Sequence, residues 1–224
     1  GDLYVVNGEP LGLVYEISDG GAHGKVVALK AHRDLNLWYR TGLPYDEIHP
    51  EDPNNVGVIA RSETDGQENM KAYKQIPDWK THYPVAAYVS DLNDENGNPG
   101  WYLPAIKEVQ AMVGWIDGEV LSPDGEAGQE PSEAMKEKRK AINQLIVDNG
   151  GNEFYFYGYD VSFIIDQTNA WEADYFNRIY TSTETDYQVH PMVFKFYLRN
   201  GWWENMHIYG DLASYGEIRP FLAF

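Results

Sequence analysis

Two amphipathic segments in the middle of the chain constrain the fold most, because they are the only long helix-like patterns between two strand-like ends. The first is "GWYLPAIKEVQAMVGWI", residues 100–116. Its apolar residues recur every three or four positions, which places them on one face of a helix: Ile106, Val109, Val113 and Ile116. Pro104 suits the first turn of this helix, where its missing N–H costs no hydrogen bond.

The second segment is "PSEAMKEKRKAINQLIVDNGG", residues 131–151. Ser132 is the predicted N-cap, since its side-chain oxygen can accept from the free N–H groups of the first turn. "NGG" at the end is a stop signal. The predicted buried face consists of Met135, Ile142, Leu145 and Ile146.

Strand-like segments lie before and after these helices. "LVYEIS" (13–18) and "KVVALK" (25–30) are joined by the glycine-rich "DGGAHG", which favours a hairpin. Residues 31–100 are expected to be mostly irregular, with short helices near 67–74 and in "YPVAAYVSDL". After the second helix, short aromatic and β-branched runs favour strands. This order predicts one α+β domain over residues 1–224, with two main helices, small antiparallel sheets and long irregular loops.

Charge and composition exclude several classes of protein. The net charge is −18, from 35 acidic and 17 basic residues, so phosphate backbones and anionic membranes are poor partners. No cysteine is present, which excludes disulfides, thiolate nucleophiles and zinc–thiolate sites. No run of about 18 apolar residues predicts a transmembrane segment. We expect a secreted or cell-surface protein whose export signal or lipid anchor has been removed from this sequence.

Five segments together resemble one protein family. They are "LGLVYEISDGGAHGKVVAL", "GWYLPAIKEVQAM", "IYTSTE", "VFKFYLRNG" and "IRPFLAF", in this order. The pattern resembles the C-terminal domain of collagen-like bacterial adhesins. That family is thought to adopt a C-type-lectin-like fold, distantly related to the formylglycine-generating-enzyme fold. The resemblance implies an exported bacterial binding domain. The stretch 31–75 carries no motif of this family, and its role stays open.

The motif residues of these segments have structural roles in this interpretation. Glu184 and Arg219 are expected to satisfy backbone groups or to pair with each other, because a buried charge must be compensated. Ser182 and Thr183 would hydrogen-bond loops, and Glu108 would anchor its helix to a loop. No catalytic residue is assigned, since no nucleophile elbow and no H-E-x-x-H motif occurs.

The aromatic C-terminal region supplies the predicted ligand site. Neighbouring residues of a strand point to opposite faces, so some of these rings should be exposed. Flat rings beside amides and carboxylates suit a glycan or a protein ligand. The alternative is that the rings pack against the loops as core. The predicted contacts are Trp203, Glu204, Asn205, His207, Tyr209 and Tyr215, with Tyr187 and His190 at the rim.

A metal site and two other functions are the alternatives. "SDLNDENGNPG" contains the oxygen ligands Asp91, Asn93, Asp94, Glu95 and Asn96, which calcium could use. The EF-hand spacing fails, because Asn96 stands where glycine is required, so a solvated turn without cofactor is the default. The first functional alternative is a carbohydrate hydrolase with a carboxylate pair. The second is a structural adhesion subunit that binds other proteins. The oligomeric state stays open.

Overall fold

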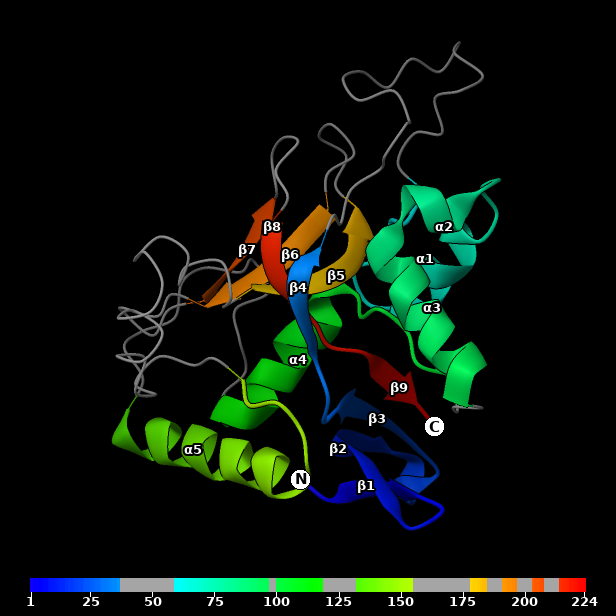
Figure 1. Cartoon of the computed structure of the whole chain (residues 1–224). Coiled ribbons are helices and arrows are strands. Elements are labelled where there is room, and N and C mark those ends of the chain that lie inside the picture. The colour runs from blue at the N-terminus through cyan, green and yellow to red at the C-terminus, as the bar shows by residue number, and fades with distance from the viewer. Residues whose placement is uncertain are drawn as a thin grey trace.

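Two β-sheets and five helices make up the described part of the chain (Figure 1). The computed structural model describes residues 1–36, 59–96, 100–118, 132–154, 178–184, 191–196, 203–207 and 214–224. Figure 1 shows the four-stranded sheet at the N- and C-terminal end of the molecule and the five-stranded sheet at the opposite end. The predicted α+β class is confirmed.

The four-stranded sheet joins the two ends of the sequence. Its strand order is β1 (Leu3–Val6), β2 (Glu9–Ser18), β3 (His23–Ala28) and β9 (Phe221–Ala223), and every pair is antiparallel. The predicted hairpin is confirmed, with a short 3₁₀ turn at Asp19–Gly21. The closing strand β9 pairs with β3 of this hairpin, so the last strand of the chain extends the sheet that begins with the first.

The five-stranded sheet contains the strands that follow the helices. Its order is β4 (His32–Asn36), β8 (Ser214–Ile218), β5 (Arg178–Glu184), β6 (Pro191–Phe196) and β7 (Trp203–His207). Strand β4 lies in the stretch that was predicted to be irregular, so that prediction is wrong there. The strand pairs of this sheet are antiparallel, as predicted, except that β5 and β8 are parallel neighbours.

Three helices, rather than two, are long. They are α3 (Pro84–Asn96), α4 (Ile106–Asp117) and α5 (Glu133–Asp148), accompanied by the shorter α1 (Gly66–Tyr73) and α2 (Trp79–His82). The predicted cap of α5 is confirmed, since the Ser132 side chain accepts from the Met135 N–H. Pro104, by contrast, precedes the N-cap of α4, which is Ala105 in an extended conformation.

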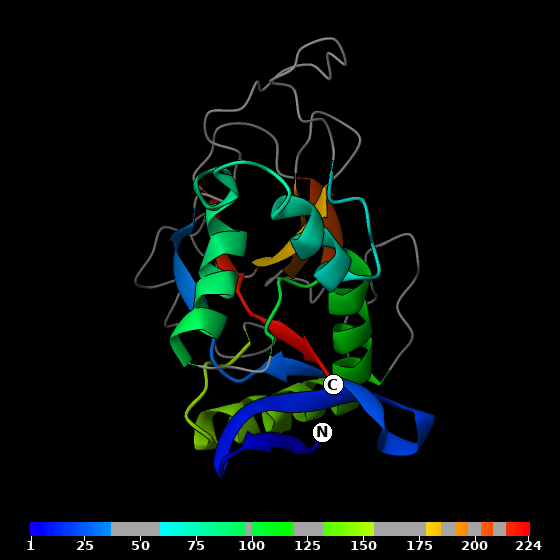
Figure 2. The same cartoon turned by 90° about the vertical axis from the view of Figure 1, so that its right-hand side faces the viewer.

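Helix α4 lies between the two sheets and forms the centre of the core (Figures 1 and 2). It packs against β2 of one sheet, β5 and β6 of the other, and α5. Its predicted apolar face is confirmed, because Ile106, Val109, Val113 and Ile116 are at most 1% exposed. Each such side chain contributes about 1.5–3 kcal/mol by leaving water. On α5, Ile142 and Ile146 are buried, while the other two predicted residues are half-buried.

Candidate functional site

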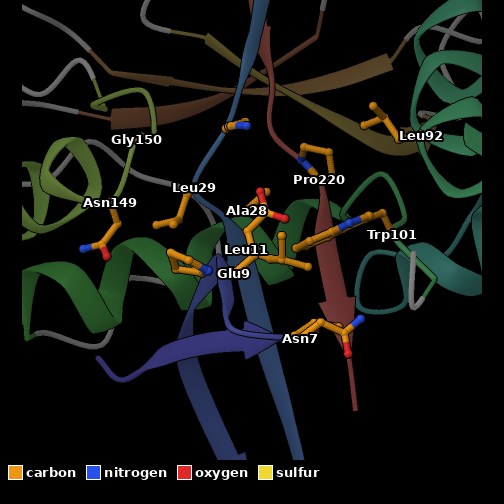
Figure 3. Close-up of a pocket in the computed structure, with 13 residues that line it drawn as sticks. Asn7, Glu9, Leu11, Ala28, Leu29, Leu92, Trp101, Asn149, Gly150 and Pro220 are labelled. Carbon is orange, nitrogen blue, oxygen red and sulfur yellow. The ribbon is translucent and has the colours of Figure 1, made fainter. Parts of the chain in front are cut away.

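A groove runs along the seam between the N-terminal hairpin and the helices (Figure 3). Its larger part is a cavity of about 580 Å³, and a second cavity of about 400 Å³ adjoins it. Four residues line both cavities, so the two form one continuous depression: Lys30, Leu92, Gly150 and Pro220. We call this depression the Trp101 groove, after the largest side chain that lines it.

The lining of the Trp101 groove combines an apolar floor with polar groups at the rim. Figure 3 shows the Trp101 ring extending toward Leu11, with Pro220 and Leu92 on the side of α3 and Asn149 on the opposite side. In the second cavity, the half-buried rings of His32 and Tyr88 stack with 4.5 Å between centroids. The polar lining residues are Asn7, Glu9, Lys30, Asn149 and Asn152.

Trp101 is held in place by the side chain of Asn93. The Trp101 N–H donates to Asn93 Oδ1 at 2.7 Å, and Asn93 Nδ2 donates to the Trp101 carbonyl at 2.8 Å. The next residue, Tyr102, exchanges two backbone hydrogen bonds with Phe221. The backbone of Trp101 is therefore fixed between α3 and the closing strand β9.

Arg219 holds the backbone on the opposite side of the groove in place. Its side chain is fully buried and donates to four backbone carbonyls, those of Ala28, Leu29, Asn152 and Glu153. These carbonyls belong to the end of β3 and to the segment after α5. The Arg219 Nε also pairs with the Glu217 carboxylate, and the guanidinium lies 4.0 Å from the centre of the Phe154 ring. The prediction that Arg219 satisfies backbone groups is confirmed, while its acidic partner Glu217 was not predicted.

The segment after α5 approaches β3 very closely at the groove. The Asn152 N–H donates to the Leu29 carbonyl, and Asn152 Oδ1 accepts from the Ala31 N–H, both at 2.9 Å. A Cβ atom at Gly151 would lie only 2.5 Å from the Leu29 oxygen, so glycine is required for this approach. Gly150 has φ of +74°, which ends α5 as the "NGG" signal predicted.

The "TSTE" segment of β5 connects the sheet to the helices and carries no open site. Between Tyr180 and Glu184 the strand bulges away from β6. Ser182 accepts from Asn69 and Tyr73 of α1, and Thr183 Oγ1 accepts from the N–H of Ile106. Glu184 Oε2 accepts from the N–H groups of Ile59 and Ala60 at 2.9 and 3.2 Å. The predicted structural roles of Ser182, Thr183 and Glu184 are confirmed.

Glu108 joins α4 to α1 and to the hairpin. Its Oε2 accepts from the N–H groups of Gly66 and Ala105, and its Oε1 accepts from the Tyr102 hydroxyl at 2.8 Å. Lys25 of β3 lies 3.0 Å from the same carboxylate. Burial, and then the charge of Glu108, raise the pKa of Tyr102 far above its ordinary value. The predicted anchoring role of Glu108 is confirmed.

The sequence-predicted ligand residues lie elsewhere. Trp203, Glu204, Asn205 and His207 belong to β7, the edge strand of the five-stranded sheet, and Tyr215 lies on β8 opposite Leu35. Tyr187, His190 and Tyr209 lie outside the described residues. The described lining of the Trp101 groove includes none of these eight. The contact role of these aromatics therefore stays a prediction.

The predicted calcium segment forms the end of helix α3 instead of a turn. All five oxygen ligands lie between Asp91 and Asn96, within α3. Asp91 pairs with Lys80, and Asn93 holds Trp101. Across the described ranges, no group of three or more His, Asp or Glu side chains is arranged to hold a metal ion. Calcium binding stays a prediction that no observation supports.

Comparison with known proteins relates this fold to one solved structure. No protein-family model and no curated protein matches the chain. A fimbrial protein from Bacteroides ovatus ATCC 8483 is similar, with a TM-score of 0.50 and 16% sequence identity. The similarity covers 92% of this chain but 37% of that protein, so this chain spans little more than a third of its length. No helix in the described ranges is long and apolar enough to cross a membrane. The fold of this chain thus also occurs within a fimbrial protein.

Proposed function

We propose that this chain is a binding domain of a cell-surface adhesion protein. One observation carries this proposal: nearly the whole chain shares its fold with part of a fimbrial protein. The likeness favours the adhesion-subunit alternative of the sequence analysis. In this proposal the chain recognises a glycan or a protein partner without chemical conversion of that partner.

The same proposal includes a C-type-lectin-like fold for this chain. The pairing of β9 with β3 supports it, because the closing "IRPFLAF" segment completes the sheet of the opening hairpin. The confirmed structural roles of Glu108, Glu184 and Arg219 support it as well, since these residues carry the motifs of the resemblance. The most specific part of this proposal is that the chain belongs with the C-terminal domains of collagen-like adhesins. Fold likeness supports function by association, so an independent test is needed.

Surface location and adherence test this function directly. Antibodies against the purified chain should label intact cells of the source organism, and protease treatment of intact cells should remove that label. A deletion strain should adhere less to its natural surface, and the wild-type gene should restore adherence. Labelling that appears only after cell lysis would contradict the proposal. Unchanged adherence of the deletion strain would contradict it as well.

A further inference from the structure

We propose that the Trp101 groove is a binding site for a short, neutral oligosaccharide. This inference deepens the proposed function, because it assigns a ligand class to an adhesion domain. Its biological meaning rests on that function, whereas binding by the purified chain can be tested alone. The site is distinct from the aromatic segment around β7 that the sequence favoured.

The size and rigidity of the groove suit a small ligand. The two adjoining cavities measure about 580 and 400 Å³, each within the range of roughly 300–1,000 Å³ that is usual for small-molecule sites. Asn93 fixes the backbone of Trp101 on one side, and Arg219 fixes the backbone of Ala28 and Leu29 on the other. A preformed site loses little conformational entropy on binding, which favours affinity for a small ligand.

The polarity of the groove suits a sugar. A sugar ring has apolar C–H faces and a periphery of hydroxyls, so it needs an apolar floor with donors and acceptors around it. Leu11, which is half-buried, and Trp101, which is 7% exposed, provide apolar lining. Asn152 uses its Oδ1 for the Ala31 N–H, which leaves its amide N–H groups to donate. Asn149 donates from Nδ2 to the Leu145 carbonyl, which leaves its Oδ1 to accept.

The charge of the groove favours a neutral ligand. Glu9 and Lys30 are exposed lining residues of opposite sign, and neither takes part in an ion pair with another described residue. Their charges offset each other, while the chain as a whole carries −18. A polyanionic glycan would be repelled by this field. A carboxylate and an ammonium group can each hydrogen-bond neutral hydroxyls.

Backbone pairing along the groove disfavours an extended peptide. A peptide that adds to a sheet edge needs free backbone N–H and C=O groups on the protein. Here the Ala28 N–H donates to the Pro220 carbonyl and the Leu29 N–H to the Leu11 carbonyl. The Ala31 N–H donates to Asn152. These three N–H groups are therefore already used, which disfavours the addition of a peptide strand along the end of β3.

Binding of the purified chain to a glycan array tests this proposal. The array should carry neutral gluco-, manno-, xylo- and chito-oligosaccharides beside sialylated and sulfated glycans, and each hit should be titrated by calorimetry. We expect saturable binding to at least one neutral series. Leu11→Trp, which fills the groove, should lower the affinity at least about tenfold. Ile17→Trp is the matched control, because it adds the same bulk at an exposed position of the same strand.

Two further variants keep the proposal testable if Leu11→Trp fails to fold. Glu9→Gln and Lys30→Gln change exposed side chains, so they should fold normally and still lower the affinity about threefold or more. Glu16→Gln, an exposed residue of β2 outside the groove, should leave affinity unchanged. Thermal unfolding of every variant shows whether the fold is retained.

Several results would overturn the proposal. They are an array without neutral hits, binding to acidic glycans alone, and equal affinity of wild type and the folded groove variants. Loss of binding in Trp203→Ala with retention in Leu11→Trp would move the site to β7. A chain that labels the cell surface and mediates adherence, but binds no neutral oligosaccharide, would refute this inference and leave the proposed function standing.

Discussion

Replacement of Arg219 by methionine should be among the most destabilising single changes in this chain. Methionine keeps much of the apolar volume of the side chain and removes all of its donors. The guanidinium bonds the carbonyls of Ala28, Leu29, Asn152 and Glu153, and it pairs with Glu217 in a fully buried setting. Its loss leaves these acceptors without the donor that now compensates their burial.

The magnitude follows from two contributions. Removing one partner of a buried ion pair costs about 3–5 kcal/mol, chiefly because the other charge stays buried. Each stranded carbonyl would add about 1–3 kcal/mol if the structure could not relax, but contributions within one network do not add fully. We therefore expect Arg219→Met to lower the free energy of unfolding by about 4–6 kcal/mol. The double variant Arg219→Met, Glu217→Gln should recover about 1–2 kcal/mol, because it removes the stranded charge.

Urea unfolding followed by circular dichroism measures this effect. Lys140→Met is the matched control, since Lys140 is an exposed residue of α5 and its change should cost less than about 0.5 kcal/mol. Amide exchange should also accelerate in residues 28–31 and 149–153 of the Arg219 variant, which form the wall of the groove. A loss below about 1 kcal/mol, or a double variant less stable than Arg219→Met, would refute the reasoning.

Three further predictions follow from the polar groups of the core. Tyr15→Phe should leave stability unchanged or raise it by about 1 kcal/mol in a urea titration, because the buried Tyr15 hydroxyl has no partner among the described residues; a loss above about 1 kcal/mol would contradict this. Burial raises the pKa of both Tyr15 and Tyr102, so the folded state retains protons that the unfolded state loses. The contribution of these two tyrosines to stability should be fully present below about pH 10. Above that pH, the free energy of unfolding should fall by up to about 1.4 kcal/mol per pH unit for each tyrosine. Tyr15→Phe should make this fall less steep, and equal steepness in both proteins would oppose the assignment. Asn93→Asp should lower the melting temperature and quicken exchange of the Trp101 amide, because the carboxylate cannot donate to the Trp101 carbonyl; Asn93→Ala with unaltered exchange would argue against this role.

Local patterns in the sequence predicted the helices and the hairpin well. The apolar spacing of α4, the Ser132 cap of α5 and the glycine-rich turn after β2 depend on neighbours within a few residues. Helix periodicity and capping act over that same short distance, so one sequence suffices to recognise them. The structural roles of Glu108 and Glu184 could also be predicted, because a buried carboxylate needs donors wherever they come from.

Pairing between distant segments could not be predicted in the same way. The parallel contact of β5 with β8 and the placement of β4 beside β8 depend on where the chain returns, not on the composition of each strand. The Trp101 groove also depends on where distant segments of the chain meet. Its lining comes from the hairpin, the end of α3, Trp101, the segment after α5 and Pro220, which lie far apart in the sequence.

Asn93 shows how local composition can mislead. It lies in a run of oxygen-bearing side chains, which is typical of calcium loops. In the structure this run ends helix α3, and the Asn93 amide holds the backbone of Trp101 with both of its polar atoms. An amide that donates and accepts at once can bond a backbone N–H and C=O, whereas a metal ion would use its oxygen alone. The signal that could have revealed this was the short separation between Asn93 and the "GWYLP" segment.

The indole N–H signals of the chain, recorded by NMR during a titration, test the central claim most directly. The chain has seven tryptophans, and single Trp→Phe variants assign the signals of Trp101 and Trp203. The titrant is the neutral oligosaccharide that binds best on the array. The groove assignment predicts that the Trp101 signal shifts saturably, with the dissociation constant found by calorimetry, while the Trp203 signal stays in place. A saturable shift of Trp203 with an unmoved Trp101 signal would contradict it and place the ligand on β7.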